Sequence, residues 1–480
     1  MPDVNPTCAP SGLAVTRRRF LSGAVAAPFL ARPTQAAAGP NAVIFMTDDH
    51  GAWALGSYGC AEMHTPNLDR LAAGGARFTR AYAATPVCSP SRMTYLTGRL
   101  PSTHGVQDWL RPVDSFGPKT RRWLAGHPTW SEILARDGYH LGMCGKWHMG
   151  EDEKAQAGFS FWATVPGGGG TYRDPEFVKN GARARLEGFK TDLVGDAAIE
   201  FLDQARGRPF CLLVPFYAPH TPFDFQPDPY RHPYDEARFS CFPNADLHPW
   251  ANPGLKSHHR NPRSQHSYSA LITGVDANVG RIERRLHELG LRDNTLVVFT
   301  ADQGWNAGHH GFWGKGNGTW PFNMHEESIR VPMIWNHPGR IAAGQVLAPL
   351  ISSYDFFPTI LDYLGVAAPA DPTRPGHSYA RLLRGPTGPW RDRLYFEYAF
   401  VRAVRTERLK YIERTEEWPS ELYDLDADPG ETRNLVDHPA LRSRRDELRA
   451  DLHRFFDTLG APPLAGWRST TRQELTVYSR

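Results

Sequence analysis

The sequence has little of what marks several large classes of protein. No apolar run approaches the roughly 20 residues that a membrane-spanning helix needs, so no stable membrane association is expected. Lys and Arg number 54 against 51 Asp and Glu, and this small excess gives no reason to expect a nucleic-acid partner. The sequence also has no internal repeat and no Cys-x-x-Cys pair, which excludes a solenoid and a zinc ribbon.

Cysteine is scarce, with six residues in a chain of 480. Cys8 lies near the N-terminus, and Cys88 lies in a motif described below. The remaining four follow the spacing of no disulfide scaffold; they are Cys60, Cys144, Cys211 and Cys241. An exported protein could pair these residues and a reduced core could equally bury them, so the sequence leaves open whether any disulfide forms.

The first 38 residues have the parts of an export signal in the right order. Three arginines at 17–19 precede a modest apolar run from Phe20 to Leu30, and Ala36-Ala37-Ala38 forms a small-residue cleavage site. The paired arginines favour a twin-arginine signal, so we expect an exported, periplasmic protein. A disordered basic N-terminus is the alternative.

The composition is that of a globular enzyme, with 41% hydrophobic and 22% charged residues. Apolar runs typical of buried parallel strands alternate with helical patterns, such as the stripe from Tyr268 to Leu289. We therefore predict an α/β fold with a doubly wound, mainly parallel sheet and helices on both faces. Past Gly365 a Pro-rich stretch precedes short alternating runs, so we expect a main domain at 39–365 and a small α+β subdomain at 366–480.

Four of the predicted strands end in polar residues. The pairs are Ala42–Thr47 with Asp48-Asp49, Tyr139–Gly145 with Lys146-Trp147-His148, Phe210–Tyr217 with His220, and Leu296–Thr300 with Asp302-Gln303. Because ligands bind beyond the carboxyl ends of strands in open α/β sheets, we expect these endings to converge on one site. Two segments, Gly158–Tyr172 and Pro222–His266, are predicted as long loops near that site.

The converging endings include a set of oxygen ligands, Asp48, Asp49, Asp302 and Gln303. Three carboxylates packed together without a cation would raise one another's pKa through repulsion, so the set predicts a bound metal ion. Hard oxygen ligands favour Ca²⁺, with Mg²⁺ as the alternative, and disfavour zinc.

The most informative string is Cys88-Ser89-Pro90-Ser91-Arg92, continued by Leu96-Thr97-Gly98-Arg99. Pro90 suits the first turn of a helix, whose free N–H groups and positive dipole end attract an anion. Arg92 adds a fork of donors that matches sulfate or phosphate oxygens. The string therefore predicts a site that can bind and attack an anion.

This string, C-x-P-S-R-x3-L-T-G-R, closely resembles the signature of type I sulfatases of the alkaline phosphatase superfamily. Strings around Lys146 and His148, His220, Asp302 and Lys315 are also similar to that family, as is Glu421–Leu425 near the end. The resemblance thus covers most of the chain. One departure is Gln303, because many members carry Asn or His there, and this puts the metal affinity in question.

The resemblance implies a cofactor and a partner for maturation. A formylglycine-generating enzyme would convert Cys88 before folding, and the hydrated aldehyde would supply the nucleophile. Calcium held by the four oxygen ligands would bind that Cys88-derived nucleophile and a sulfate oxygen.

The resemblance also implies roles for the remaining residues. Arg92 and Lys146 would hold the hydrate and the sulfate, and Asp302 would take the nucleophile's proton. His220 and Lys315 would protonate the leaving alcohol. His148 would remove the proton that lets sulfate leave and the aldehyde return.

The substrate is expected to be a small-molecule or glycan sulfate ester, with sulfated sugars and aryl sulfates as candidates. Trp147 and His310 are candidate substrate contacts. A phosphonate or phosphate ester hydrolase of the same superfamily is one alternative. A non-catalytic exported binding protein with an unmodified Cys88 is the other.

Overall fold

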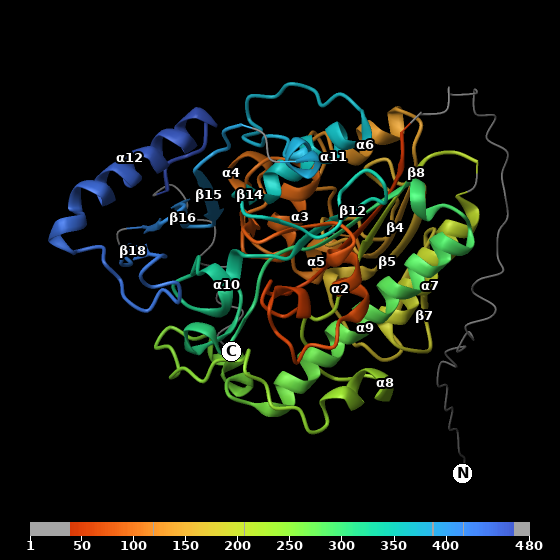
Figure 1. Ribbon diagram of the computed structural model, residues 1–480, viewed down its shortest axis with the longest axis horizontal. Helices are drawn as coiled ribbons and strands as arrows, with labels where there is room; N and C mark the ends of the chain where they lie inside the picture. Colours follow the sequence, from red (N-terminus) through yellow and green to blue (C-terminus); the bar gives the residue numbers. More distant parts are fainter. Residues whose placement is uncertain (1–38, 119, 206, 386–387, 416, 465–480) are drawn as a thin grey trace, which may run out of the picture.

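The computed structural model describes residues 39–464 except 119, 206, 386–387 and 416. The predicted export signal at 1–38 lies outside these residues. Within them no helix is long and apolar enough to cross a membrane. The fold is built on a ten-stranded sheet with the strand order β13-β2-β12-β9-β1-β8-β4-β5-β6-β7 (Figure 1).

The centre of this sheet is parallel. Its five strands are β9 (Thr295–Ala301), β1 (Asn41–Thr47), β8 (Phe210–Pro215), β4 (His140–Lys146) and β5 (Phe161–Val165). The outer strands are β12 (Met333–Asn336), β2 (Ala76–Phe78) and β13 (Gln345–Leu347) on one side, and β6 (Glu176–Lys179) and β7 (Ala182–Arg185) on the other. Antiparallel pairs join β12 to β9 and β6 to β5, so the predicted mainly parallel α/β sheet is confirmed.

Helices bury both faces of the sheet, as the continuous apolar strands require. Ile44 of β1 packs with α3 (Cys88–Thr97), α6 (Trp130–Arg136) and α11 (Phe356–Leu364). Phe45, one residue on, faces the other side with α2 (Pro66–Ala73), α7 (Lys190–Gln204) and α9 (Pro262–Glu288). Figure 1 shows α7 and α9 side by side on that face.

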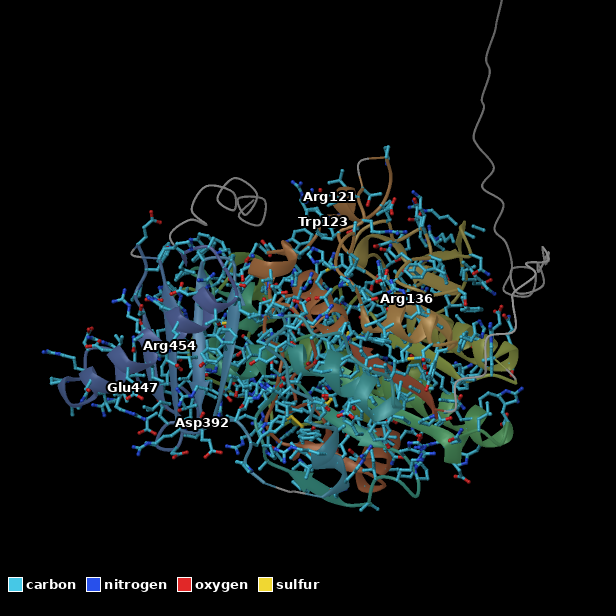
Figure 2. All side chains as sticks on the ribbon, turned by 90° about the horizontal axis from the view of Figure 1, so that it is seen from above. Arg121, Trp123, Arg136, Asp392, Glu447 and Arg454 are labelled. Atoms are coloured by element: carbon cyan, nitrogen blue, oxygen red, sulfur yellow. A yellow bond between two sulfur atoms is a disulfide. The ribbon has the colours of Figure 1, made fainter. Side chains whose placement is uncertain are left out.

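A separate antiparallel sheet forms the C-terminal part. It contains β15 (Arg393–Tyr398), β16 (Val401–Thr406), β17 (Leu409–Arg414) and β18 (Glu421–Asp424), and α12 (Arg442–Thr458) packs on it. Figure 2 shows this lobe beside the main body, with the exposed Asp392, Glu447 and Arg454 on it. The lobe is the expected small α+β subdomain, and the boundary at 365/366 stays a prediction.

Shorter elements complete the fold. They include β3 (Ala81–Tyr82) with β14 (Ile351–Ser352), β10 (Asn306–Ala307) with β11 (Trp313–Gly314), α4 (Pro101–His104), α5 (Pro112–Ser115), η7 (Gly316–Gly318) and α10 (Glu326–Ile329).

The two predicted loops differ from the expectation. Gly158–Tyr172 contains β5, because this run of apolar and β-branched residues pairs with β4. A turn precedes β5, and the short helix η2 (Pro166–Gly168) and a loop follow it. Pro222–His266 holds only short helical turns before α9 begins at Pro262. A disulfide between Cys60 and Cys241 ties this second loop to the segment after β1, a pairing that sequence spacing did not predict. Cys144 and Cys211 are buried and free.

Candidate active site

The polar strand endings meet at one edge of the sheet, as predicted. The register pairs Thr47 of β1 with Ala301 of β9, so the two acidic endings lie next to each other. The Asp302 N–H donates to the Thr47 carbonyl at 2.9 Å, which fixes this junction. The ending of β8 joins it from the other side, since the Asp48 N–H donates to the Ala218 carbonyl at 3.3 Å.

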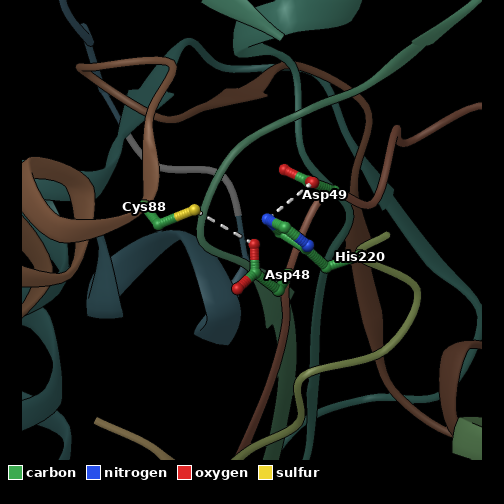
Figure 3. Close-up of side chains that lie close together, drawn as sticks. All are labelled: Asp48, Asp49, Cys88 and His220. Atoms are coloured by element: carbon green, nitrogen blue, oxygen red, sulfur yellow. Dashed lines mark hydrogen bonds and ion pairs between the residues drawn. The ribbon is translucent and has the colours of Figure 1, made fainter. Parts of the chain in front are cut away.

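Cys88 is the first residue of α3 and faces these endings (Figure 3). Its Sγ lies 3.2 Å from Asp48 Oδ1 and 2.7 Å from Lys315 Nζ. Burial and the Asp48 carboxylate raise the pKa of the Cys88 thiol to about 12. The unmodified side chain is therefore a neutral thiol at pH 7, and a thiol is a poor nucleophile.

The four predicted oxygen ligands are all buried in one cluster. Gln303 Nε2 donates to Asp49 Oδ1 at 2.6 Å, while Gln303 Oε1 and Asp49 Oδ2 have no hydrogen-bond partner within the described residues. Burial and the neighbouring Asp48 raise the pKa of Asp302 to about 7. Unpaired oxygens among crowded carboxylates fit a hard divalent cation, which would bind them and relieve their repulsion.

Two buried cations, Arg92 and Lys146, contact the carboxylates. Arg92 Nε donates to Asp302 Oδ2 at 2.9 Å, and its Nη2 lies 3.3 Å from Asp48 Oδ2. Lys146 pairs with Asp48 through its Nζ. Burial opposes ionisation of Asp48, but Lys146 and the other nearby cations hold its pKa well below the usual range. Lys146 also lines the cavity described below, whereas Arg92 orients the carboxylates.

Lys315 lies between Cys88 and the cluster of predicted oxygen ligands. Its Nζ lies 2.6 Å from Asp49 Oδ1 as well as 2.7 Å from Cys88 Sγ. Burial opposes its charge, but Asp49 and Cys88 raise the pKa of Lys315 well above its ordinary value. The side chain is thus a protonated ammonium at neutral pH.

His220 lies on the open side of the cluster, where Figure 3 shows its ring directed at Asp49. Its Nε2 is 3.5 Å from Asp49 Oδ2, and its Nδ1 contacts the Thr221 carbonyl. Burial lowers the pKa of His220 to about 4, although Asp49 opposes that shift. The ring is therefore neutral at pH 7, and Lys315 is the charged member of the pair.

His148 occupies a different wall. Its Nε2 donates to the Leu110 carbonyl at 2.6 Å, which fixes the tautomer and leaves Nδ1 as an acceptor. That buried Nδ1 has no hydrogen-bond partner within the residues described. Burial, reinforced by Lys146, lowers the pKa of His148 well below its ordinary value. A neutral imidazole with a free lone pair is suited to accept a proton.

Two predicted substrate contacts, Trp147 and His310, lie away from the cavity above Cys88. Trp147 is fully buried and packs on Phe159 and Trp162, because neighbouring residues at the end of a strand point to opposite sides. His310 stacks on the His325 ring at 4.0 Å, and its Nε2 lies 2.6 Å from Glu327 Oε2. Neither Trp147 nor His310 lines the cavity above Cys88.

A cavity of about 270 Å³ opens above Cys88, just below the usual range for small-molecule pockets. Its floor includes Asp49, Lys146, His148, His220 and Lys315. The outer wall was missed by sequence reasoning and contains Trp109, Pro112, Gly167–Gly169, Thr221, Asn252, Leu255, Trp305 and Asn317. The glycine run and two other residues of this wall, Asn252 and Leu255, lie in the two loops that the sequence predicted near the site.

The sulfatase family model matches residues 40–366, about two thirds of the chain. The chain belongs to the sulfatase family. A second model, N-sulphoglucosamine sulphohydrolase C-terminal, matches residues 308–457 of this sulfatase. Its activity is accordingly the hydrolysis of sulfate esters.

Named relatives agree with this assignment. The sulfatase is 28% identical to N-acetylglucosamine-6-O-sulfatase of Bacteroides thetaiotaomicron, over 85% of each chain. It is 30% identical to human arylsulfatase A, over 87% of this chain and 86% of the relative. A solved structure of a protein in complex with its substrate D-glucosamine-2-N,6-O-disulfate superposes with a TM-score of 0.75 at 25% identity, covering 88% of this chain and 98% of the other. A phosphonate monoester hydrolase of Agrobacterium radiobacter, at 22% identity and a TM-score of 0.68, shares the fold.

Proposed function

We propose that this sulfatase hydrolyses sulfated sugars with a formylglycine made from Cys88 and a calcium ion at the oxygen cluster. The observation that carries the proposal is the position of Cys88 Sγ, within 3.2 Å of both Asp48 Oδ1 and Lys315 Nζ. A protonated, buried thiol at that point is inert, whereas an aldehyde hydrate there would be a nucleophile flanked by a cation and a metal site.

Asp48, Asp49, Asp302 and Gln303 would hold the calcium ion. When bound, such an ion polarises a sulfate oxygen and orients the ester for attack. Gln303 would turn its amide so that the oxygen, in place of the Nε2 that donates to Asp49, faces the ion. Arg92 would keep Asp302 in place through its bonds to that carboxylate. Lys146, on the cavity floor, would bind a sulfate oxygen by charge.

Protons move at two separate walls in this proposal. Lys315 is charged and stands at the nucleophile position, so it would donate toward the leaving alcohol. His220 is neutral until an anionic ester enters, and that charge would raise its pKa and let it share this role. His148 would accept a proton at Nδ1 to restore the resting enzyme after the alcohol has left.

The outer wall of the cavity supports a sulfated sugar as the substrate. Trp109 offers an apolar ring face, and Asn252 and Asn317 line the same opening with amide-bearing side chains. Aromatic faces beside hydrogen-bonding amides suit a ring that has both C–H faces and hydroxyls. The relative named for N-acetylglucosamine 6-O-sulfate hydrolysis supports the same class.

We also propose that the sulfatase is exported through its N-terminal twin-arginine segment, and meets a formylglycine-generating enzyme before it folds. The Cys60–Cys241 disulfide supports this, because disulfides persist mainly in oxidising compartments. Fusing residues 1–38 to a reporter and changing Arg17 and Arg18 to Lys tests the export step.

A panel of esters tests the substrate class. Released inorganic sulfate is measured with nitrophenyl sulfate, choline sulfate and mono-sulfated glucosamine and galactose, with a phosphonate monoester as the control. We expect the highest kcat/KM with a sulfated sugar. A higher kcat/KM for the phosphonate would support the phosphonate hydrolase alternative, and intact thiol in an inactive protein would support a binding protein.

A further inference from the structure

Lys190 is a buried cation that the proposed mechanism does not use. It is fully buried at the first position of α7. No ion pair joins its Nζ to a carboxylate within 4 Å in the part of the chain that the structure describes. Burial and the nearby Lys146 lower the pKa of Lys190 to about 7, while Asp224 and Asp48 oppose that shift. An unpaired buried ammonium costs several kcal/mol, so its contacts need an explanation.

Those contacts lead to the glycine-rich wall of the cavity. Lys190 Nζ donates to the Gly169 carbonyl at 3.0 Å and to the Gly170 carbonyl at 2.8 Å. The ammonium also lies 3.9 Å from the centre of the Tyr217 ring, whose face stabilises the charge. Through these two hydrogen bonds Lys190 holds the C-terminal end of the loop from Pro166 to Gly170.

A buried carboxylate holds the other end of the same loop. Asp152 is fully buried, and its Oδ2 accepts a hydrogen bond from the Gly167 N–H at 2.9 Å. The loop cannot fix its own shape, because it has almost no side chains. Gly167, Gly168 and Gly170 adopt φ values of +71°, +65° and +88°, which other residues rarely adopt. Its conformation therefore depends on contacts from other segments: Asp152 and Lys190 at its two ends, and Phe116, which packs against Gly167.

Gly168, in the middle of the loop, contacts His148, which has a role in the proposed mechanism. A Cβ placed on Gly168 would lie 2.3 Å from Cδ2 of the His148 ring, so the glycine is in direct contact with the imidazole. The Leu110 carbonyl holds the Nε2 side of that ring. The loop and Leu110 together fix the direction of His148 Nδ1.

We propose that Lys190 is a positioning residue that holds the 166–170 loop against His148 and thereby sets the direction of Nδ1. The inference rests on the proposed role of His148 as the base that restores the resting enzyme. Loss of Lys190 would leave the loop carbonyls without donors and free Gly168 from the imidazole. Loss of Lys190 would leave Cys88 and the residues of the oxygen-ligand cluster unchanged.

A double-mutant cycle tests this coupling. The folded enzyme is assayed with nitrophenyl sulfate as the wild type, Lys190→Met, His148→Ala and the double variant. We expect Lys190→Met to lower kcat about 10- to 100-fold, as loss of supporting contacts commonly does, with KM changed less than about 3-fold. In the His148→Ala background the same substitution should lower kcat by less than about 2-fold, because the group that it positions is gone.

A matched control separates positioning from general damage. Lys179 is also largely buried, on β6, but its Nζ pairs with the Glu200 carboxylate rather than with the carbonyls of the 166–170 loop. Lys179→Met should leave kcat within about 2-fold in both backgrounds. If Lys190→Met does not accumulate as folded protein, Lys190→Leu, which also removes the donor, takes its place in the cycle.

Each outcome decides the inference. A Lys190 effect of equal size in both backgrounds overturns it, because the lysine would then be structural only. No Lys190 effect beside a large His148 effect also overturns it while the proposed mechanism stands. No effect of His148→Ala overturns the proposed role of His148 and the inference with it.

Discussion

Lys315 and Cys88 come from segments more than 200 residues apart, yet the lysine Nζ and the cysteine Sγ lie 2.7 Å from each other. The same Nζ is 2.6 Å from Asp49 Oδ1. One ammonium group therefore connects Cys88 to the carboxylate cluster. This arrangement makes the modification of Cys88 the first property to test.

Cys88 should be formylglycine in the active enzyme. Mass spectrometry of the tryptic peptide that contains residue 88 should show the aldehyde or its hydrate, and Cys88→Ala should lower kcat about 10⁴-fold or more, as loss of a nucleophile does. An intact thiol in fully active enzyme would contradict the proposed mechanism.

The oxygen cluster should bind about one hard divalent cation per chain. Chelation should abolish activity, and Ca²⁺ should restore it better than Zn²⁺. Gln303→Asn should raise the Ca²⁺ concentration for half-maximal activity about 10-fold, since the shorter amide reaches less far. Elemental analysis that finds two zinc ions would favour a phosphatase-like site instead.

His220 and His148 should respond differently to the leaving group. His220→Ala should slow a sugar sulfate at least about 10-fold more than nitrophenyl sulfate, because proton donation matters most for a poor leaving alcohol. His148→Ala should slow both esters alike and give a burst of alcohol release, since its step follows loss of the alcohol. If both variants depend equally on the leaving group and neither gives a burst of alcohol release, the two histidines do not have these separate roles.

The strand endings and the signature around Cys88 could be predicted because each depends on local sequence. Apolar runs identify strands, and parallel strands bring their ends together. Trp109, Asn317 and Lys190 could not be found in this way, because only tertiary packing brings the first two to the cavity and Lys190 to its glycine wall. The burial of Trp147 has a local reason, since alternation along β4 directs it away from the side of Lys146.

The pair of His310 and Glu327 should contribute stability that depends on pH. Burial opposes ionisation of Glu327, but the hydrogen bond from His310 lowers its pKa to about 2. Its contribution is complete above the unfolded value near 4.5 and is lost as pH falls toward about 2. Glu327→Gln should therefore cost about 2 kcal/mol of unfolding free energy at pH 6, and the cost should shrink as denaturation is followed down to pH 2 to 3. A cost that stays constant with pH would exclude the ion pair as its source.

The disulfide should stabilise the loop that carries Cys241. It closes a span of 181 residues, so its removal raises the conformational entropy of the unfolded chain substantially. The double variant Cys60→Ser/Cys241→Ser should lose about 2–5 kcal/mol in urea unfolding, with kcat of the remaining folded enzyme changed less than about 3-fold. Unchanged stability would mean that the two cysteines are reduced in the mature protein.

The place of β1 in the sheet also determines when the site is lost during unfolding. β1 is paired on both sides, with β8 and β9, and it leads directly into Asp48 and Asp49. The amides of such a central strand exchange with deuterium only through near-global opening, whereas loops open at little cost in free energy. The carboxylates are thus anchored to the slowest-exchanging strand, while the outer cavity wall lies on loops such as 166–170. Mild denaturant should consequently impair recognition of the sugar before it disperses the metal ligands.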